Sequence, residues 1–467
     1  MLTIPTLLLT LAAAGFGADP LAAKKDPPKP LADLARDLRD PDRSKRLAAA
    51  EVIRDHYKGK SLDALPQILE ALGEQLDRPE SHPGPVTLAE ARTAYLGTTL
   101  RQAADAAGPG RVKVIRESTR HENPRVRAAA FHLWLGVAYD KGAGVDRNEY
   151  LAAVRHGLKD DSPLVRGQAA FALHAFRDWP PTYVAQPGFR DAPPEVMGKV
   201  ISLLAATLED RVKPREGVQS PAYHATVVLH NLKADAKPAI PALAKAAATD
   251  DERLVRISCQ ALGAIAAADQ TVGDDVVRIL RPLFTDKKRP NVLRASAARG
   301  LMGIGPAARW VVQDLADILE EPGASSDLAG AAFTALYDMG PRAAPAVPTL
   351  LKLLEQSAAQ REQIQALPAH RAIGSAALWL PGWDGWAEWV KRPPHRQGIA
   401  REYGPLMTLE KWMAMTTEAE QRQILFTLKA IGPAAAPAIE PLKRYVEKVS
   451  NPTLQQEALL TLHAIQK

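Results

Sequence analysis

The chain has 467 residues, more than one hydrophobic core usually holds, so we expect either several domains or an elongated array. Aromatic residues make up 5% of the chain and the hydrophobic class 46%, which leaves most apolar packing to alanine, leucine, valine and isoleucine. The 59 basic and 53 acidic residues give a net charge of +6, and because both signs are interspersed, the composition does not predict a nucleic-acid-binding surface.

The first predicted element is a signal peptide over residues 1–17. Leu2 to Ala14 forms an apolar core without a charged side chain, and Gly15-Phe16-Gly17 offers small residues where a signal peptidase cleaves. The alternative is an uncleaved anchor, but the apolar core is shorter than the roughly 20 residues of a membrane-spanning helix. Because no later segment is apolar enough to span a bilayer, we expect no transmembrane helix after cleavage. Residues 18–30 follow as a flexible lead-in. This segment predicts an exported protein, periplasmic or extracellular.

A recurring helix-start signature comes next in the chain. An Asp, Asn or Ser precedes an apolar run that carries an arginine, as at Arg127, Arg166, Arg256 and Arg294. Arg127 and Arg166 are 39 residues apart, and Arg256 and Arg294 are 38 apart. A short polar side chain before such a run caps the free backbone N–H groups of a helix, so we expect a helix to begin at each signature.

A helix-end signature alternates with it. The segments are Ile304-Gly305-Pro306, Met339-Gly340-Pro341 and Ile431-Gly432-Pro433. Glycine accepts the left-handed conformation that ends a helix, and proline fits the first turn of the next one. Lys233 takes the equivalent place 72 residues before Gly305, which is two periods of 36. The two signatures together predict stacked helical hairpins, because neither amphipathic helix of a pair can bury its apolar face alone.

These motifs resemble the HEAT-repeat family, in its short bacterial type with an armadillo-like helical fold. The resemblance covers residues 31–356, the predicted HEAT-repeat array, and 417–467, the predicted C-terminal repeats and capping helix. It implies an all-α fold, a right-handed α-α superhelix that serves as a binding scaffold. It also implies that the arginines of the helix-start signature form a structural polar ladder between adjacent repeats.

Residues 357–416 interrupt the array as an insertion or a degenerate repeat. Five of the eight tryptophans of the chain lie in this segment, at Trp379, Trp383, Trp386, Trp389 and Trp412. One interpretation is a local apolar cluster that packs against the last repeats. The other is an aromatic contact surface for a partner, and we take these tryptophans as candidate partner-binding residues.

No other segment predicts catalysis, a cofactor or a metal. Gly303 to Ala308 matches a dinucleotide-binding glycine pattern, but no strand precedes it and Pro306 removes a needed N–H donor. The eleven histidines form no ligand pair at helical spacing. The single cysteine, Cys259, excludes an intrachain disulfide, and we expect it to be an inert packing thiol.

We therefore predict an exported, non-enzymatic HEAT-repeat scaffold that binds a protein or peptide partner. The partner would lie on the concave face of the solenoid or at the tryptophan-rich insertion. The alternative is an enzyme similar to the HEAT-like lyases that act on tetrapyrrole chromophores, which would need acids or a histidine converging in a pocket. A peripheral contact between residues 24–60 and an anionic envelope surface is compatible with the scaffold.

Overall fold

The structure is a computed structural model that describes residues 28–77, 96–108, 110–139, 144–176, 189, 191–365 and 409–467. The predicted signal peptide and most of the predicted lead-in lie outside these residues. The predicted insertion shares its first residues with one described helix and its last with another, and 366–408 lie outside the description.

The chain divides into two compact units. Unit 1 comprises Met1–Gln75 and Glu80–Val114, and unit 2 comprises Leu76–Pro79 and Ile115–Lys467. The described helices of unit 1 are α1 (Leu31–Asp37), α2 (Arg43–His56), the 3₁₀ helix η1 (Leu62–Ala64) and α5 (Leu96–Asp105). Helices α3 (Leu65–Asp77) and α6 (Arg111–Ser118) extend across the unit boundaries in the sequence.

The core of unit 1 forms where α2 packs against α5. The Asp42 side chain accepts a hydrogen bond from the Ser44 N–H and so caps the start of α2. After α2, the Gly59 N–H donates to the Ala106 carbonyl at 2.7 Å. A Cβ on Gly108 would lie 2.4 Å from the Gly59 carbonyl oxygen, so the close approach of the two segments requires glycine there.

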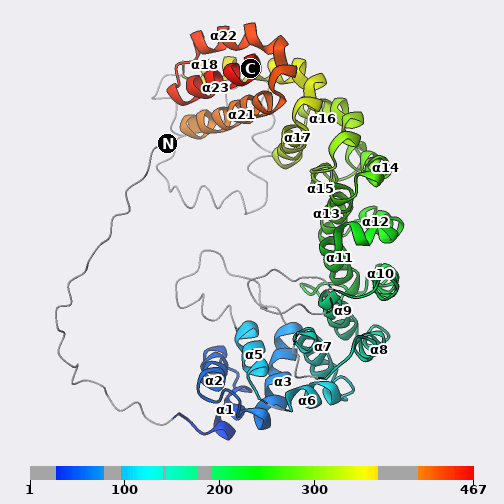
Figure 1. Ribbon diagram of the computed structural model, residues 1–467. Helices are drawn as coiled ribbons and strands as arrows, with labels where there is room; N and C mark the ends of the chain where they lie inside the picture. Colours follow the sequence, from blue (N-terminus) through cyan, green and yellow to red (C-terminus); the bar gives the residue numbers. More distant parts are fainter. Residues whose placement is uncertain are drawn as a thin grey trace, which may run out of the picture. The chain divides into compact units, whose positions relative to one another are not determined.

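Unit 2 consists of two layers of helices (Figure 1). Layer 1 contains α7 (Pro124–Ala138), α9 (Pro163–Ala172), α11 (Pro221–Leu232), α13 (Glu252–Ala268), α15 (Asn291–Arg299), α17 (Ser326–Met339), α21 (Leu409–Ile431) and α23 (Pro452–Gln466). Each of these helices packs against the next member of the same layer.

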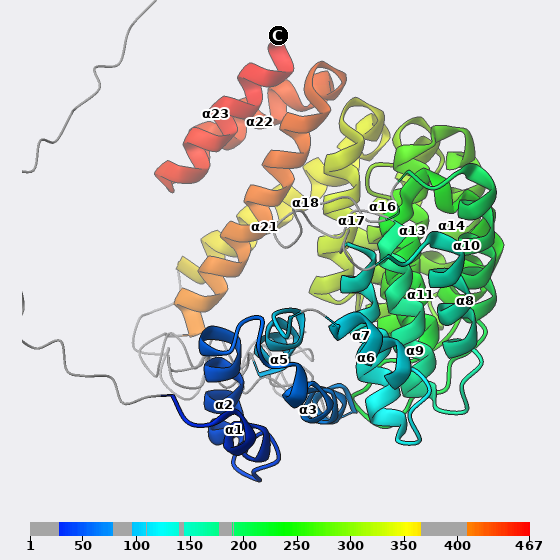
Figure 2. The ribbon, with the colours of Figure 1, turned by 60° about the horizontal axis from the view of Figure 1, so that its bottom comes forward.

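Layer 2 lies on one side of layer 1, as α8, α10 and α14 do beside α9, α11 and α13 in Figures 1 and 2. Its helices are α8 (Arg147–Gly157), α10 (Pro194–Thr207), α12 (Ile240–Ala247), α14 (Gly273–Thr285), α16 (Val312–Glu320), α18 (Val347–Gln365) and α22 (Ile439–Lys448). The helices of the two layers alternate along the chain, so each consecutive pair is one structural repeat.

The predicted helix starts are confirmed. Helix α7 begins at Pro124, where the Asn123 side chain accepts from the Arg125 N–H at 2.9 Å. Helix α13 begins at Glu252, and Asp251 caps it by accepting from two backbone N–H groups. Helices α9 and α15 also begin at their signatures, at Pro163 and Asn291, but no side-chain hydrogen bond caps them. The predicted cap, which supplies the acceptor that the first turn of a helix lacks, is therefore present at two of the four signatures.

The predicted helix ends are confirmed at Lys233, Gly340 and Gly432, whereas helix α15 already ends at Arg299, before Gly305. Gly305, Gly340 and Gly432 have φ values of +77°, +55° and +62°, and Lys233 has +51°. The next α-helix does not begin at once, because a seven-residue 3₁₀ helix intervenes. These segments are η4 (Lys233–Ala239), η6 (Gly305–Val311), η7 (Gly340–Ala346) and η11 (Gly432–Ala438).

The core of unit 2 lies between the layers and between successive repeats. The apolar side predicted for α9 is fully buried at Val165, Ala169 and Ala172, and it continues through Leu173 and Phe176 of the 3₁₀ helix η3 (Leu173–Phe176). The described residues contain helices and connecting segments but no strand. The predicted all-α repeat fold is therefore confirmed for the described part of the chain.

Candidate functional site

The arginine ladder that the repeat motif implies is present at three positions. Arg127 of α7 holds Asp160 through two hydrogen bonds of 2.8 Å, and Arg166 of α9 holds Asp210 in the same way. Arg294 of α15 is almost fully buried and binds both carboxylate oxygens of Glu321, which lowers the pKa of that carboxyl group. Each pair joins one repeat to the residues before the next, so these arginines are structural.

The fourth predicted member, Arg256, is not part of the ladder. Its side chain is exposed, and it makes none of the ion pairs found among the described residues. Arg289 of the following repeat instead donates to the carbonyl groups of Ala247 and Thr249. Arg127 and Arg166 each bind the two carbonyl groups that lie five and six residues before them, and no such contact is found for Arg256 among the described residues. Arg289 therefore makes a different contact between neighbouring repeats, and Arg256 makes none of the contacts of the ladder.

The structure brings together a row of rings that the sequence spacing does not reveal. His132 of α7 stacks on Phe171 of α9, with centroids 5.2 Å apart and planes at 6°. Phe171 also meets His174 of η3 and His224 of α11 edge to face, at 5.1 and 6.3 Å. We call His132, Phe171, His174 and His224 the ring row. It joins three consecutive layer-1 helices.

The ring row lacks the electrostatics of a catalytic or metal site. Burial, with a smaller effect from the nearby His224, lowers the pKa of His174 to about 3. Burial also lowers the pKa of His224 to about 4, so both imidazoles are neutral at physiological pH. No group of three or more His, Cys, Asp or Glu side chains within the described ranges could hold a metal ion.

The predicted packing role of Cys259 is confirmed by its surroundings. The thiol is fully buried in α13. Burial raises its pKa to about 12, so the thiolate that would act as a nucleophile does not form at neutral pH.

The surface feature best suited to binding is a groove between α17 and α21, which we call the layer-1 groove. Its volume is about 490 Å³, within the range of ligand pockets. The lining residues come from two neighbouring helices of the same layer: Phe333, Thr334 and Tyr337 from α17, and Gln423, Phe426, Thr427, Lys429 and Ala430 from α21. Unlike the ring row, this groove leaves large apolar side chains exposed.

Two aromatic residues dominate the groove. Tyr337 is 54% exposed and Phe426 is 40% exposed, whereas Phe333 beside them is 6% exposed. The hydroxyl groups of Thr334 and Thr427 donate to carbonyl oxygens of their own helices, at 2.7 and 2.8 Å. Neither hydroxyl proton is therefore free for a ligand, and the wall is mainly apolar. Such an exposed aromatic patch has the chemistry of a protein-binding hot spot.

The candidate tryptophans of the sequence stay a prediction. Trp379, Trp383, Trp386 and Trp389 lie outside the described residues, and Trp412 lies in α21 without a described side chain. Sequence reasoning missed the groove, although one signal was available. Tyr337 lies two residues before Met339, which is buried in the same helix. Residues at this spacing point to opposite sides of an α-helix, so Tyr337 falls on the polar side.

None of the described helices has both the length and the apolar character needed to cross a membrane. No family profile and no curated protein sequence matches the chain.

Solved structures show the fold. The chain is similar to karyopherin Kap121p bound to the SUMO protease Ulp1p, with a TM-score of 0.52 and 12% identity over 94% of this chain and 45% of that one. Kap121p bound to Pho4p gives the same score and identity over 93% and 45%. Importin beta gives 0.45 and 14%, covering 92% of this chain and 57% of that one. The chain thus spans less than two thirds of these proteins, and it has a HEAT-like helical-repeat fold.

Proposed function

We propose that this protein is a non-enzymatic scaffold that binds a protein or peptide partner in the layer-1 groove. The observation that carries the proposal is the exposure of Tyr337 and Phe426 side by side on neighbouring repeats. Covering two aromatic side chains of this size is favourable for binding, because each removes a large apolar area from water. A peptide with an apolar or aromatic anchor residue fits this chemistry.

The repeat architecture supports the same proposal. Helical-repeat proteins stack their units so that adjacent helices present one continuous surface, which commonly binds extended partners. In Kap121p, a protein of similar fold, the bound molecules are Ulp1p and Pho4p. Because burial keeps His174 and His224 neutral and Cys259 protonated, neither the ring row nor the cysteine offers an effective general base or nucleophile, which favours a scaffold over a lyase-type enzyme.

The wider setting is also proposed. The short bacterial HEAT family fits the two alternating signatures, and the apolar N-terminus fits a signal peptide over residues 1–17, a lead-in over 18–30 and export to the periplasm or the exterior. The repeat array would then cover residues 31–356 and 417–467, with the tryptophan-rich segment 357–416 inserted next to the groove-forming helix α21.

The test is a selection of peptides from a displayed random library on the purified protein, followed by titration of the enriched peptides. We expect Phe426→Ser and Tyr337→Ser each to weaken binding by about 30-fold, as loss of a hot-spot side chain does. The matched control is Trp310→Ser, because Trp310 is 61% exposed on η6 and does not line the groove.

Circular dichroism and thermal unfolding of each variant separate lost binding from lost folding. The proposal fails if the selection enriches no peptide, or if peptides bind the folded groove variants as tightly as they bind the unaltered protein.

A further inference from the structure

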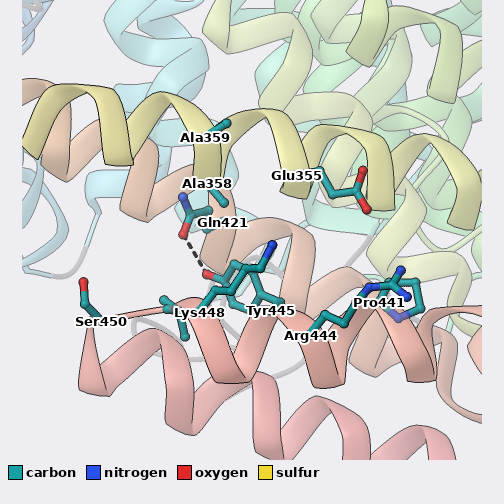
Figure 3. Close-up of a pocket in the computed structure, with 10 residues that line it drawn as sticks. Glu355, Ala358, Ala359, Gln421, Pro441, Arg444, Tyr445, Lys448 and Ser450 are labelled. Carbon is teal, nitrogen blue, oxygen red and sulfur yellow. Dashed lines mark hydrogen bonds between the residues drawn. The ribbon is translucent and has the colours of Figure 1, made fainter. Parts of the chain in front are cut away.

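A second pocket lies between α18, α21 and α22 and shares no lining residue with the layer-1 groove. We call it the α22 pocket (Figure 3). Its volume is about 330 Å³. The polar groups that line it are Glu355 of α18, Gln421 of α21, Arg444, Tyr445 and Lys448 of α22, and Ser450 after α22. A pocket with this many polar groups differs in chemistry from the aromatic groove.

A buried hydrogen-bond network holds the floor of the α22 pocket. The Tyr445 hydroxyl donates to Gln421 Oε1 at 2.7 Å, as the dashed line in Figure 3 shows. The Gln421 side-chain amide then donates to Ser357 Oγ at 3.4 Å. Gln421 is fully buried and Tyr445 is 9% exposed, so this chain of contacts fixes α22 against α18 and α21. The pocket is therefore preformed.

Two cations on the wall of the pocket have no carboxylate in direct contact with them among the described residues; the nearby Glu440 is bound by Lys443, and Arg444 adds only a smaller part to the lowering of its pKa. Arg444 and Lys448 are exposed, lie four residues apart on one face of α22, and make no ion pair within 4.0 Å. Lys443 on the same helix is different, because Glu440 binds its ammonium group at 2.7 Å. Two like charges at this spacing repel each other slightly, so an anion between them would relieve a small destabilisation.

We propose that the α22 pocket binds the carboxylate of an acidic side chain on a peptide or protein partner. The Arg444 guanidinium can bind both oxygens of a carboxylate, and Lys448 lies one helical turn further along to add a second charge. The methylene stem of a glutamate can contact Ala358 and Val449, which also line the pocket.

The charge balance favours a carboxylate over a phosphate group. Glu355 lies across the pocket on α18, so the lining carries two positive charges and one negative charge. A net charge of one balances a singly charged carboxylate, whereas the phosphate of a phosphopeptide would leave an uncompensated negative charge beside Glu355. The inference goes beyond the proposed function, because it concerns a different site and a different chemistry.

The test is the binding of a short fluorescent peptide that carries glutamates in a glycine–serine background, measured by anisotropy at physiological salt. We expect Arg444→Gln and Lys448→Gln each to weaken binding about tenfold, and the same peptide with glutamine in place of glutamate not to bind. Lys443→Gln is the matched control, because it removes the same charge from the same helix outside the pocket. Phe426→Ser should leave this binding unchanged, which separates it from the layer-1 groove.

A variant of opposite sign sharpens the test. Glu355→Gln removes the one carboxylate of the lining and should tighten binding several-fold, whereas Glu447→Gln on the exposed side of α22 should have no such effect. The proposal is overturned if the glutamate peptide does not bind, if Lys443→Gln weakens binding as much as Arg444→Gln, or if Glu447→Gln tightens it as much as Glu355→Gln. All of these side chains are exposed, so the variants are expected to fold.

Discussion

The two ends of layer 1 use aromatic residues in opposite ways. In α7, α9 and α11 the rings of His132, Phe171 and His224 contact one another across the repeats and are at least half-buried. In α17 and α21 the rings of Tyr337 and Phe426 are exposed along a groove. The same layer thus contains one set of aromatic side chains that pack against one another and one set that stays exposed to solvent.

The difference extends to the polar contacts between repeats. Helices α7 and α9 contribute Arg127 and Arg166 to the ladder, whereas α17 has Ala329 at the place that Arg294 occupies in α15, 35 residues earlier. We infer that the first region is specialised for holding repeats together and the second for contact with another molecule. The role of an aromatic residue therefore depends on whether other side chains bury its ring, and the residue type alone does not indicate this.

The largest expected effect comes from exchanging a ring in each region. We expect Phe171→Ala to lower the free energy of unfolding by about 3 kcal/mol, because it removes the central ring of the row and leaves a cavity. Phe426→Ala should lower it by less than about 1 kcal/mol, because the side chain is already 40% exposed, while it weakens binding to the groove as Phe426→Ser does. Urea unfolding of both variants measures the two losses of unfolding free energy. Equal losses would contradict the proposed difference between the two regions.

A second expected effect is a loss of stability in mild acid that begins at the ring row. His174 has a pKa of about 3 in the fold and about 6.5 when unfolded, so the unfolded chain binds more protons below pH 6.5. The contribution of the neutral His174 to the free energy of unfolding is complete above pH 6.5. Below pH 6.5 it falls by up to about 1.4 kcal/mol per pH unit, so about 2 kcal/mol is lost at pH 5. His224 is half-buried and adds less.

Hydrogen exchange at pH 7 and pH 5 locates this effect. Amides of α9 and α11 should exchange faster at pH 5 relative to those of α17 and α21, whose sequences contain no histidine. His174→Gln should remove much of the difference, and His463→Gln on the exposed side of α23 should not. Uniform acceleration over all four helices would argue against a local origin.

A third effect, of similar size, tests the ladder. Arg166→Met should cost about 2 kcal/mol, because Asp210 loses a charge-assisted pair and two carbonyl groups lose their donor. Arg253→Met on α13 should cost close to nothing, because Arg253 is exposed and makes no ion pair among the described residues. Thermal unfolding of both variants compares them, and an equal loss of stability would show that the ladder contributes no more than surface charge.

The periodic part of the fold was readable from the sequence. Capping residues such as Asp251 and helix-ending residues such as Gly340 act on their own neighbours, and local rules therefore locate them. Arg256 was misassigned because a ladder contact requires a carboxylate of the following repeat beside the arginine, as Asp160 is beside Arg127, and no local pattern indicates whether one is there.

The binding features were much less readable. The ring row joins His132 to Phe171 and His224 across gaps of 39 and 53 residues, which differ from each other because the connection before α11 is longer. The layer-1 groove lies between α17 and α21, which are separated in the sequence by the predicted insertion. Contacts of this kind depend on how the repeats stack, and a motif that describes one repeat does not contain that information.

The smallest expected effect compares how α11 and α17 end. Lys233 has φ +51° and ψ −124°, nearly the conformation of Gly340 at +55° and −129°. A side chain in this region costs about 1–3 kcal/mol, whereas glycine costs about 0.5–1 kcal/mol in extra freedom of the unfolded chain. Lys233→Gly should therefore raise the free energy of unfolding by about 1 kcal/mol, and Gly340→Ala should lower it. Because Lys233 is exposed, the gain is set by the backbone, and a Lys233→Ala variant that gained as much as Lys233→Gly would assign it to the lost charge instead.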